Sequence, residues 1–476
     1  METVVSYIGG ADVIPSSGVY SDKYDPRTGR PAKKIAASGA PEVAKAVQAA
    51  EAAGQAWRDL RPAHRGRILV EFGRRIRENE ARLGAIESAE TGKPPRDMAT
   101  LIDLTAEFFE YFGGVINAMD GKIVNEGPDY HVYSRRDPHG VIGVILPWNA
   151  PLHQAARAIA PAVAMGNTVI AKPSEHTPGS LVELAKIATQ AGVPAGVLNI
   201  VVGKGLEIGP AMVAEKAVRK ISFTGSVRAG RELGRLAADR ILPLTLELGG
   251  KSADIVFADA DFEAAASGAV RGFTWNTGQW CAAGTRLLVE ASIHDKFVKR
   301  FVQNVAALKI GPDGLGPITT HDQFEKVQSY FEIARKDGAT LAIGGKVAGG
   351  PGLEGGWYIE PTVYTGVTSD MTVAREEIFG PVVCVIPFQD EADAIRIANG
   401  LDFGLSAGIW SRDIGRVHRV AGRLEAGRIV VNEYGGGFVQ TAAGGFKESG
   451  YGREQGIEAL AEYSQLKSVI IRLPAN

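Results

Sequence analysis

Short apolar runs alternate with helical windows from Gly140 to Leu246. Strand and helix in strict alternation predict βαβ units, in which helices cover both faces of a parallel sheet. The predicted strands are Val141 to Leu146, Thr168 to Ala171, Val197 to Val201, Lys220 to Thr224 and Leu242 to Leu246. The predicted helices between them are Leu152 to Ala164, Ser180 to Gln190, Gly205 to Val213 and Ser226 to Ala238.

A second alternating series follows and predicts a second α/β domain. Its strands are Ile255 to Phe257, Arg286 to Glu290, Val382 to Phe388, Ser406 to Trp410 and Arg428 to Val431. A chain of 476 residues is too long for one hydrophobic core, so two or three domains are expected. We place the break near Gly249-Gly250-Lys251, which gives a first domain of residues 1–120 and 139–249 and a second of 250–445.

A third, smaller unit is predicted from two distant segments. Residues 41–119 repeat apolar positions at helical spacing, but residues 121–138 alternate and contain Gly127-Pro128, which indicates a β-hairpin. The tail from Tyr463 to Leu473 alternates again. We expect this late strand to pair with the hairpin, within the chain or in a neighbour, so residues 121–138 and 460–476 form a small β-domain.

Composition excludes several classes of protein. The formal charge is −2 without long single-sign blocks, which gives no footprint for nucleic acid or a charged membrane surface. Two distant cysteines make neither a disulfide framework nor a metal site, so no metal is expected. Residues 1–10 lack a signal-peptide pattern, and no apolar run is long enough to span a membrane. A cytoplasmic location is expected.

Cys281 is the candidate nucleophile. It lies among small, turn-forming residues in Asn276 to Gly284, whereas Cys384 lies in an apolar, β-branched run that predicts a buried strand. A free cysteine is more often a small buried hydrophobe than a reactive group. Cys281 therefore needs polar partners from elsewhere in the chain to act in catalysis.

Two such partners follow predicted strands, where parallel sheets bind ligands. Asn149 follows the first strand, and its carboxamide can stabilise negative charge on oxygen, although an Asn between prolines is usually a turn residue. Glu247 ends the fifth strand, where burial would raise its pKa towards the range of a general base.

Two other strand ends suggest a dinucleotide site. Glu175, after Lys172, could accept hydrogen bonds from an adenosine ribose and repel a 2′-phosphate, or the two residues could form a solvated pair. Gly225 and Ser226 place a helix N-terminus where a pyrophosphate could bind, although the GxGxxG pattern is absent there.

Seven motifs occur in register over more than 300 residues: PWN, KPSE, FTGS, ELGG, GQWC, EEIFGP and GGFKESGYGRE. In their order and spacing the chain resembles the NAD(P)-dependent aldehyde dehydrogenase superfamily. The resemblance implies an α/β fold with a Rossmann-like cofactor domain, a catalytic domain bearing Cys281 and a bridging β-domain for oligomerisation. It also implies a homodimer or homotetramer.

The resemblance assigns roles to residues. It implies that Cys281 adds to the aldehyde, that Asn149 and the Cys281 backbone N–H hold the oxyanion, and that hydride passes to the nicotinamide. It further implies that Glu247 activates the water that hydrolyses the thioester and that Glu454 relays protons. Glu175 argues for NAD over NADP, with NADP as an alternative. The expected cofactor residues are Leu146, Pro147, Trp148, Lys172, Ser174, Glu175, Phe223, Thr224, Gly225, Ser226, Leu248, Glu377 and Phe379.

The substrate is less constrained. By alignment on the motifs, four positions where aromatic residues commonly line the substrate funnel are here Ala150, Arg157, Gly437 and Ala443, so we expect a wider, more polar tunnel. Arg157 resembles an arginine of enzymes that take acidic semialdehydes or hydroxylated aromatic aldehydes, although a helix arginine is more often a surface residue. Trp280 and Phe438 are expected to contact the substrate. The alternative functions are a cofactor-independent cysteine esterase and a non-catalytic binding protein on the same fold.

Overall fold

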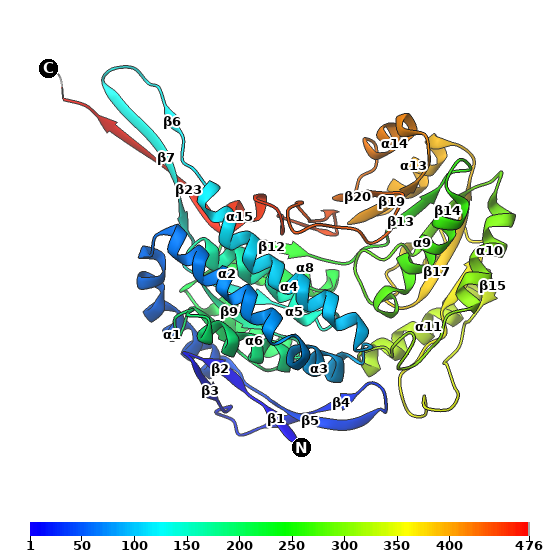
Figure 1. Ribbon diagram of the computed structural model, residues 1–476, viewed down its shortest axis with the longest axis horizontal. Helices are drawn as coiled ribbons and strands as arrows, with labels where there is room; N and C mark the ends of the chain where they lie inside the picture. The colour runs from blue at the N-terminus through cyan, green and yellow to red at the C-terminus, as the bar shows by residue number, and fades with distance from the viewer. Residues whose placement is uncertain (475–476) are drawn as a thin grey trace.

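Five parallel strands form the centre of an eight-stranded sheet, as the alternation from Gly140 onward predicts (Figure 1). The computed structural model describes residues 1–474. The sheet order is β22 (Gly450–Tyr451), β12 (Leu244–Glu247), β11 (Val218–Thr224), β8 (Val141–Ile145), β9 (Thr168–Lys172), β10 (Leu198–Ile200), β2 (Ser6–Ile8) and β3 (Ala11–Val13). The three outer strands, β22, β2 and β3, run antiparallel to their neighbours.

Helices cover both faces of this sheet because its strands carry apolar side chains on both sides. In β8, Ile142 and Val144 join one hydrophobic cluster, whereas Val141 and Ile145 join another on the opposite face. The first cluster packs under α2 (Pro62–Glu78), α3 (Glu80–Thr91), α4 (Arg96–Val115), α5 (Pro151–Ala164) and α6 (Gly179–Gln190). The second packs under α1 (Ala40–Asp59), α7 (Gly205–Ala214) and α8 (Val227–Ala238).

The second predicted domain contains a seven-stranded sheet, parallel except for its first strand. Its order is β15 (Thr340–Ile343), β16 (Thr362–Thr365), β17 (Val382–Phe388), β14 (Arg286–Glu290), β13 (Ala253–Val256), β19 (Ser406–Trp410) and β20 (Arg428–Val431). Around it lie α9 (Phe262–Thr274), α10 (His294–Ala306), α11 (His321–Asp337), α12 (Thr372–Arg375), α13 (Glu391–Asn399) and α14 (Ile414–Ala421). Cys384 is fully buried in β17, as predicted.

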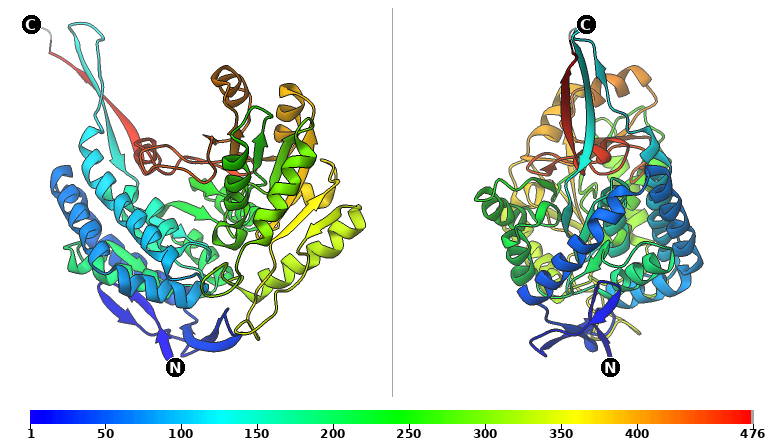
Figure 2. Two further views of the ribbon diagram at one scale, coloured as in Figure 1. Left: turned by 45° about the vertical axis from the view of Figure 1, so that its right-hand side comes forward. Right: turned by 90° about the vertical axis from the view of Figure 1, so that its left-hand side faces the viewer.

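The predicted hairpin and the late strand pair within the chain. They form a three-stranded antiparallel sheet of β23 (Ser464–Arg472), β7 (Tyr130–Pro138) and β6 (Ile123–Val124). This sheet projects from the body of the molecule as an arm, preceded by α15 (Glu458–Glu462) (Figure 2). The last two residues of the expected bridging segment, 475 and 476, lie outside the described residues.

Two features were not predicted from the sequence. The first 36 residues contain five strands, of which β1 (Glu2–Val4), β5 (Arg30–Ala36) and β4 (Tyr20–Asp25) form a separate sheet. The glycine-dense segment near the C-terminus forms β21 (Phe446–Lys447), which pairs with β18 (Phe403–Gly404), and then β22. Through β22 the C-terminal segment returns to the first sheet and pairs with β12.

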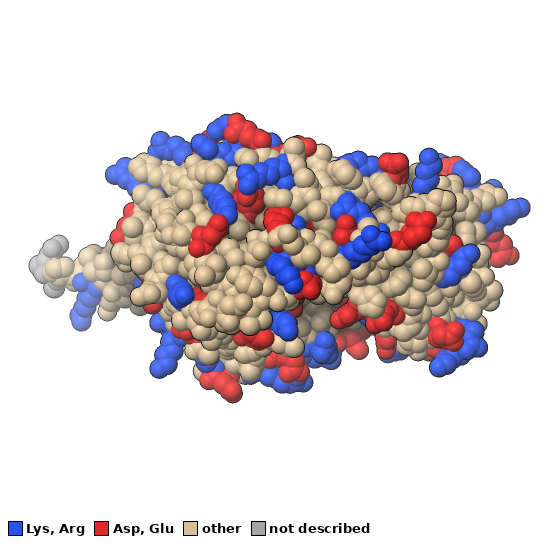
Figure 3. Space-filling model, turned by 90° about the horizontal axis from the view of Figure 1, so that it is seen from below, with Lys and Arg blue, Asp and Glu red and all other residues tan. Residues whose placement is uncertain are grey.

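Seen from below, Lys and Arg side chains are interspersed with Asp and Glu (Figure 3). This mixture agrees with the near balance of charges in the sequence. Within residues 1–474, no helix combines the length and the apolar character needed to cross a membrane.

Candidate active site

Cys281 lies in a loop whose backbone is held in an uncommon conformation. The loop follows α9 through a short turn, η2 (Trp275–Gly278), in which Asn276, Thr277 and Gly278 all have positive φ, between 51° and 72°. The buried Gln279 side chain fixes it: its Oε1 accepts from the Thr319 N–H (2.9 Å) and its Nε2 donates to the carbonyl of Asn276 (3.1 Å). A loop constrained in this way holds the following cysteine in a defined position.

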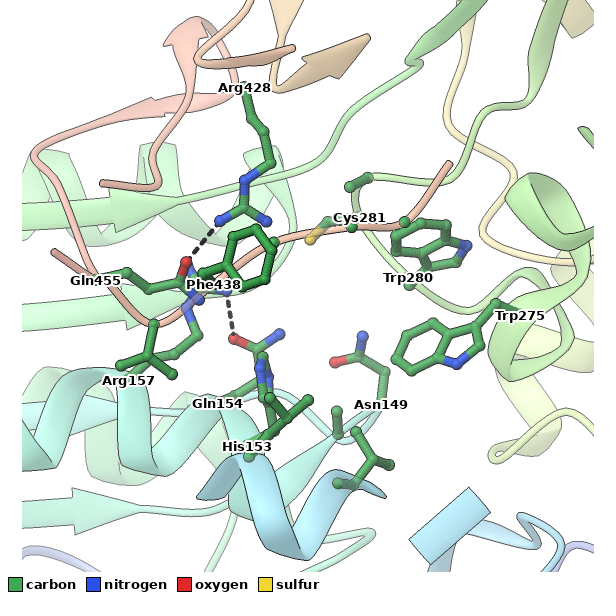
Figure 4. Close-up of a pocket in the computed structure, with 18 of the residues that line it drawn as sticks. Asn149, His153, Gln154, Arg157, Trp275, Trp280, Cys281, Arg428, Phe438 and Gln455 are labelled. Atoms are coloured by element: carbon green, nitrogen blue, oxygen red, sulfur yellow. Dashed lines mark hydrogen bonds between the residues drawn. The ribbon is translucent and has the colours of Figure 1, made fainter. Parts of the chain in front are cut away.

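Two cavities meet at Cys281. The first cavity extends towards the carboxyl ends of β8, β11 and β12. The second, shown in Figure 4, lies between α4, α5 and the segment after β20. Cys281, Asn149 and Gln154 line both cavities. The thiol is half-buried and is not sealed in an apolar interior. A molecule in either cavity can therefore reach the sulfur.

Asn149 is fixed beside the cysteine loop. Its Nδ2 donates one hydrogen bond to the carbonyl of Gln279 (3.0 Å), and its backbone carbonyl accepts from Asn276 Nδ2 (3.0 Å). The carboxamide is almost fully buried, and the residue lines both cavities. Because an amide nitrogen carries two N–H groups, one donor remains for a ligand oxygen next to Cys281.

Glu247 ends β12 and is paired on both sides. Its neighbours in the sheet are Thr224 of β11 and Gly450 of β22. The carboxylate is 4% exposed, and burial raises its pKa to about 7, partly opposed by the nearby Arg157 guanidinium. A carboxyl group with a pKa near neutrality is suited to accept a proton from water.

Arg157 bridges two carboxylates instead of pointing to solvent. Its Nη2 lies 3.2 Å from Glu247 Oε2 and 2.9 Å from Glu454 Oε2, and its Nη1 donates to Gln154 Oε1 (3.0 Å). All four side chains are buried. The alternative prediction, that Arg157 is a surface residue, is therefore wrong. The arginine does line the second cavity, but its Nη groups are occupied by protein partners.

Glu454 is also held by Ser222 of β11, which donates to its Oε1 (3.0 Å). The network of buried polar groups therefore runs from Glu247 through Arg157 and Glu454 to the middle of the first sheet. Because an arginine keeps its proton in proteins, Arg157 holds the two carboxylates in place and does not itself pass a proton between them.

The thiol of Cys281 is not ionised in this environment. Burial raises its pKa to about 11, Arg157 lowers it, and Glu247 and Glu377 raise it further. The sulfur consequently needs a base to become a nucleophile, and Glu247 lines the first cavity together with it.

Eight of the thirteen expected cofactor residues line the first cavity: Pro147, Trp148, Thr224, Gly225, Ser226, Leu248, Glu377 and Phe379. Ser226 caps α8, its Oγ accepting from the Ala229 N–H at 3.3 Å, so the helix N-terminus faces this cavity. Trp148 and Phe379 meet edge to face with centroids 5.4 Å apart. Glu377 Oε1 accepts from the Gly250 N–H (3.0 Å), and burial raises its pKa.

The remaining five do not line the first cavity: Leu146, Lys172, Ser174, Glu175 and Phe223. Lys172 Nζ forms an ion pair with Glu175 Oε2 at 2.8 Å, and the lysine is almost fully buried. The pair is therefore not fully solvated. Sequence reasoning missed Gln323 and Lys326 of α11, which line the cavity from the second domain and belong to no recognised motif.

All three expected substrate residues, Arg157, Trp280 and Phe438, line the second cavity. Trp280 packs edge to face against Trp275 and Tyr434, with centroids 5.2 and 6.0 Å away. Ala150 and Gly437, where aromatic residues were expected to be missing, line it too. The prediction for Ala443 is wrong, because this residue is buried, its backbone pairs with that of Glu454, and it does not line the cavity. Residues that no sequence signal identified complete the wall, namely Leu101, Leu104, Phe108, His153, Gln154, Arg271, Trp275, Ala282, Arg428, Tyr434, Gly435, Gly436, Val439 and Gln455.

Comparison with known proteins agrees with this geometry. A model described as the aldehyde dehydrogenase family matches residues 14–469. A betaine aldehyde dehydrogenase of Mesorhizobium japonicum is 43% identical, with 98% of this chain and 97% of the relative covered.

Solved structures give the same result. An indole-3-acetaldehyde dehydrogenase of P. syringae, in complex with NAD+ and IAA, superposes with a TM-score of 0.96 at 36% identity, covering 98% of this chain and 96% of the other. A betaine aldehyde dehydrogenase of Staphylococcus aureus, in complex with NAD+, gives a TM-score of 0.96 at 34% identity over 98% and 97% of the two chains.

Proposed function

The chain belongs to the aldehyde dehydrogenase family, its chemistry is aldehyde oxidation, and we propose that it uses NAD and a covalent intermediate on Cys281. One observation carries this proposal: two cavities, one lined by strand ends of the first sheet and one by residues of α4 and α5, share Cys281 and Asn149 in their walls. An enzyme that brings an aldehyde and a dinucleotide to one atom requires this arrangement.

The first cavity fits a dinucleotide. The capped N-terminus of α8 offers free backbone N–H groups to a pyrophosphate, and the Glu377 carboxylate offers an acceptor to ribose hydroxyls. A Cβ at Gly249 would lie 2.5 Å from Glu377 Oε2, so the glycine leaves room for this carboxylate. Relatives of known structure are complexes with NAD+. When bound there, NAD supplies the acceptor for a hydride.

The residues around Cys281 divide the remaining steps. Glu247 accepts the thiol proton, and the thiolate adds to the aldehyde carbon, giving a hemithioacetal. The free Asn149 N–H and the Cys281 backbone N–H stabilise the oxyanion; one such donor is worth roughly 2.7–4 kcal/mol of activation free energy. After oxidation to the thioester, Glu247 accepts a proton from water, which attacks the acyl carbon and releases the carboxylic acid with the thiol. Arg157 stays protonated and orients Glu247, and Glu454, on the other side of the same guanidinium, is the group that relays the proton onward.

The second cavity favours an aromatic aldehyde or an acidic semialdehyde. Phe108, Trp275, Trp280 and Phe438 supply flat apolar contacts, and Arg271 and Arg428 supply positive charge. The charge of Arg157 is offset by Glu247 and Glu454. The names of the relatives suggest betaine aldehyde instead, and aromatic side chains do bind quaternary ammonium groups. The guanidinium groups of Arg271 and Arg428 in the same cavity oppose a cationic substrate, so we do not assign betaine aldehyde to this chain.

Activity with a neutral benzaldehyde tests the proposal. NAD-dependent formation of benzoate is expected from the wild-type protein, and Cys281→Ala should abolish it without changing the thermal unfolding midpoint. Hydrolysis of an aryl ester at full rate without NAD, together with no aldehyde oxidation, would instead identify the cysteine esterase. The absence of both activities with every aldehyde and ester tested would favour the non-catalytic binding protein.

We also propose a homodimer or homotetramer in the cytoplasm. The support for assembly is the projecting sheet of β23, β7 and β6, which exposes Leu466, Ile470 and Ile123 at 64%, 69% and 79%. Edge strands with exposed apolar side chains favour pairing with another chain. The support for the location is that Cys281 and Cys384 are both free thiols. Sedimentation velocity of the full chain tests the assembly, and a monomer would contradict it.

A further inference from the structure

The second cavity is positively charged and contains no acid among the described residues that line it. Its charged side chains are Arg157, Arg271 and Arg428. Arg157 is neutralised by Glu247 and Glu454, which lie behind it, and Arg271 is exposed to solvent. Arg428 is the remaining guanidinium, half-buried at the start of β20.

Arg428 points from β20 into the second cavity, towards Gln455 and the cysteine (Figure 4). Its recorded side-chain partner is Gln455, whose Oε1 accepts from Nη2 at 2.5 Å. No carboxylate lies within 4.0 Å of it among residues 1–474. The guanidinium therefore retains several N–H donors and a full positive charge on the cavity side.

A structural arginine in the same sheet looks different. Arg286 of β14 is 4% exposed, and its Nε, Nη1 and Nη2 donate to the carbonyls of Lys251, Ile397 and Ala398, each at 2.8 Å. Those bonds tie separate parts of the backbone together. Arg428 makes no comparable set of contacts, so a role in holding the backbone does not explain its position.

The wall opposite Arg428 leaves room for its head group. A Cβ at Gly437 would lie 2.8 Å from Nη1 and 3.1 Å from Cζ. Any side chain at residue 437 would therefore displace the guanidinium from its place in the cavity. Burial and the neighbouring Arg157 lower the pKa of Arg428, while Cys281 and Glu247 raise it, so the group lies within electrostatic reach of the reaction centre.

We propose that Arg428 is the specificity-determining residue that binds the negatively charged end of the substrate, a flat aldehyde bearing a carboxylate. The inference rests on the proposed function and adds the substrate class. A guanidinium binds a carboxylate through two parallel N–H donors, and the aromatic side chains of the second cavity pack against the body of the molecule. Arg157 takes no part in this contact because its Nη groups bind protein partners.

Three para-substituted benzaldehydes of different charge test this contact. They are 4-carboxybenzaldehyde, its neutral methyl ester and the cationic 4-trimethylammonio compound. We expect wild-type kcat/KM with NAD to fall in that order. Arg428→Gln should lower kcat/KM for the anion about 30-fold, mainly by raising KM. It should change kcat/KM for the ester by less than about twofold and raise kcat/KM for the cation. Arg300→Gln replaces a half-buried arginine on α10 that does not line the second cavity; it is the matched control and should leave kcat/KM for all three aldehydes unchanged.

Two further variants keep the inference falsifiable if Arg428→Gln does not fold. Arg428→Lys keeps the charge but loses the paired donors, and it should retain only part of the preference for the anion. Gly437→Ala keeps the arginine but displaces its guanidinium, and it should lower kcat/KM for the anionic aldehyde alone. A wild-type protein that oxidises the ester but prefers the cation, or an Arg428→Gln protein with an unchanged anion preference, would overturn the inference. Failure to oxidise any of the three aldehydes would count against the proposed function itself.

Discussion

Replacing Arg157 by methionine should shift the pH at which the enzyme works. In the wild type, the Glu247 carboxyl has a pKa of about 7, and only its ionised form accepts a proton. The turnover number is therefore expected to rise with pH through about 7 and to fall about tenfold per pH unit well below it. Methionine preserves much of the volume of the arginine stem but removes the guanidinium that lies between Glu247 and Glu454.

The size of the shift follows from the two contacts. An opposite charge in contact lowers a carboxyl pKa by roughly 1–3 units, so the loss of Arg157 should raise that of Glu247 by about two. Two units correspond to about 2.7 kcal/mol. The ionised fraction at pH 7 then falls from about one half to about one in a hundred, so kcat should fall roughly 50-fold and recover near pH 9.

The assay is kcat against pH, from about pH 6 to 10, with a neutral benzaldehyde and saturating NAD. Arg157→Lys should give an intermediate midpoint, and thermal unfolding identifies any variant that does not fold. A kcat profile of Arg157→Met with the wild-type midpoint would refute the positioning role. A loss confined to anionic aldehydes, expressed in KM, would instead make Arg157 the anion anchor.

Three further results are expected. Alkylation of Cys281 by iodoacetamide should accelerate about tenfold per pH unit between pH 7 and 10, because the pKa of the thiol is about 11. Mass spectrometry of the labelled peptides measures the rate, and fast labelling at pH 7 would contradict the prediction. Glu175→Gln should narrow the preference for NAD over NADP about tenfold by removing a charge that repels the 2′-phosphate, and equal kcat/KM ratios in both proteins would exclude that role. Gly278→Ala should destabilise the protein by more than about 2 kcal/mol in thermal or urea unfolding, because φ is +72° and the new Cβ would lie 2.2 Å from the Gly380 carbonyl oxygen. The control is Gly234→Ala, in open space on α8, which should not destabilise the protein.

The local periodicity of the sequence was enough to predict both central sheets. Apolar runs such as Val141 to Leu146 and Val382 to Phe388 differ so clearly from the helical windows around them that the strands could be predicted to within a few residues. The N-terminal strands were missed because they are short and half-exposed, as in Tyr20–Asp25. The two-residue strand Gly450–Tyr451 is too short to have any period, and its pairing depends on a partner two hundred residues away.

Some residues of the site could likewise be predicted from the sequence, and others could not. Asn149, Glu247 and Cys281 could be predicted because each is a reactive residue type at a strand end or turn, and the motifs connect them. The bridging of Glu247 and Glu454 by Arg157 could not be predicted, since a single arginine on α5 does not reveal which side of the helix packs against which carboxylate. Arg428 had no local signal at all, because it is the first residue of an ordinary apolar strand.

The covalent state of Cys281 tests the central claim most directly. In Glu247→Gln, the acceptor for both the thiol proton and the water proton is lost. A thiol with a pKa of about 11 can still ionise slowly to solvent, whereas water, with a pKa of about 15.7, cannot, so the acyl group should form slowly and then accumulate on the cysteine. Intact-mass analysis after mixing this variant with benzaldehyde and NAD should give one added benzoyl group per chain, located on the peptide that contains Cys281. Benzoate formation by the wild type without any acyl adduct in Glu247→Gln, or an adduct on another residue, would contradict the account.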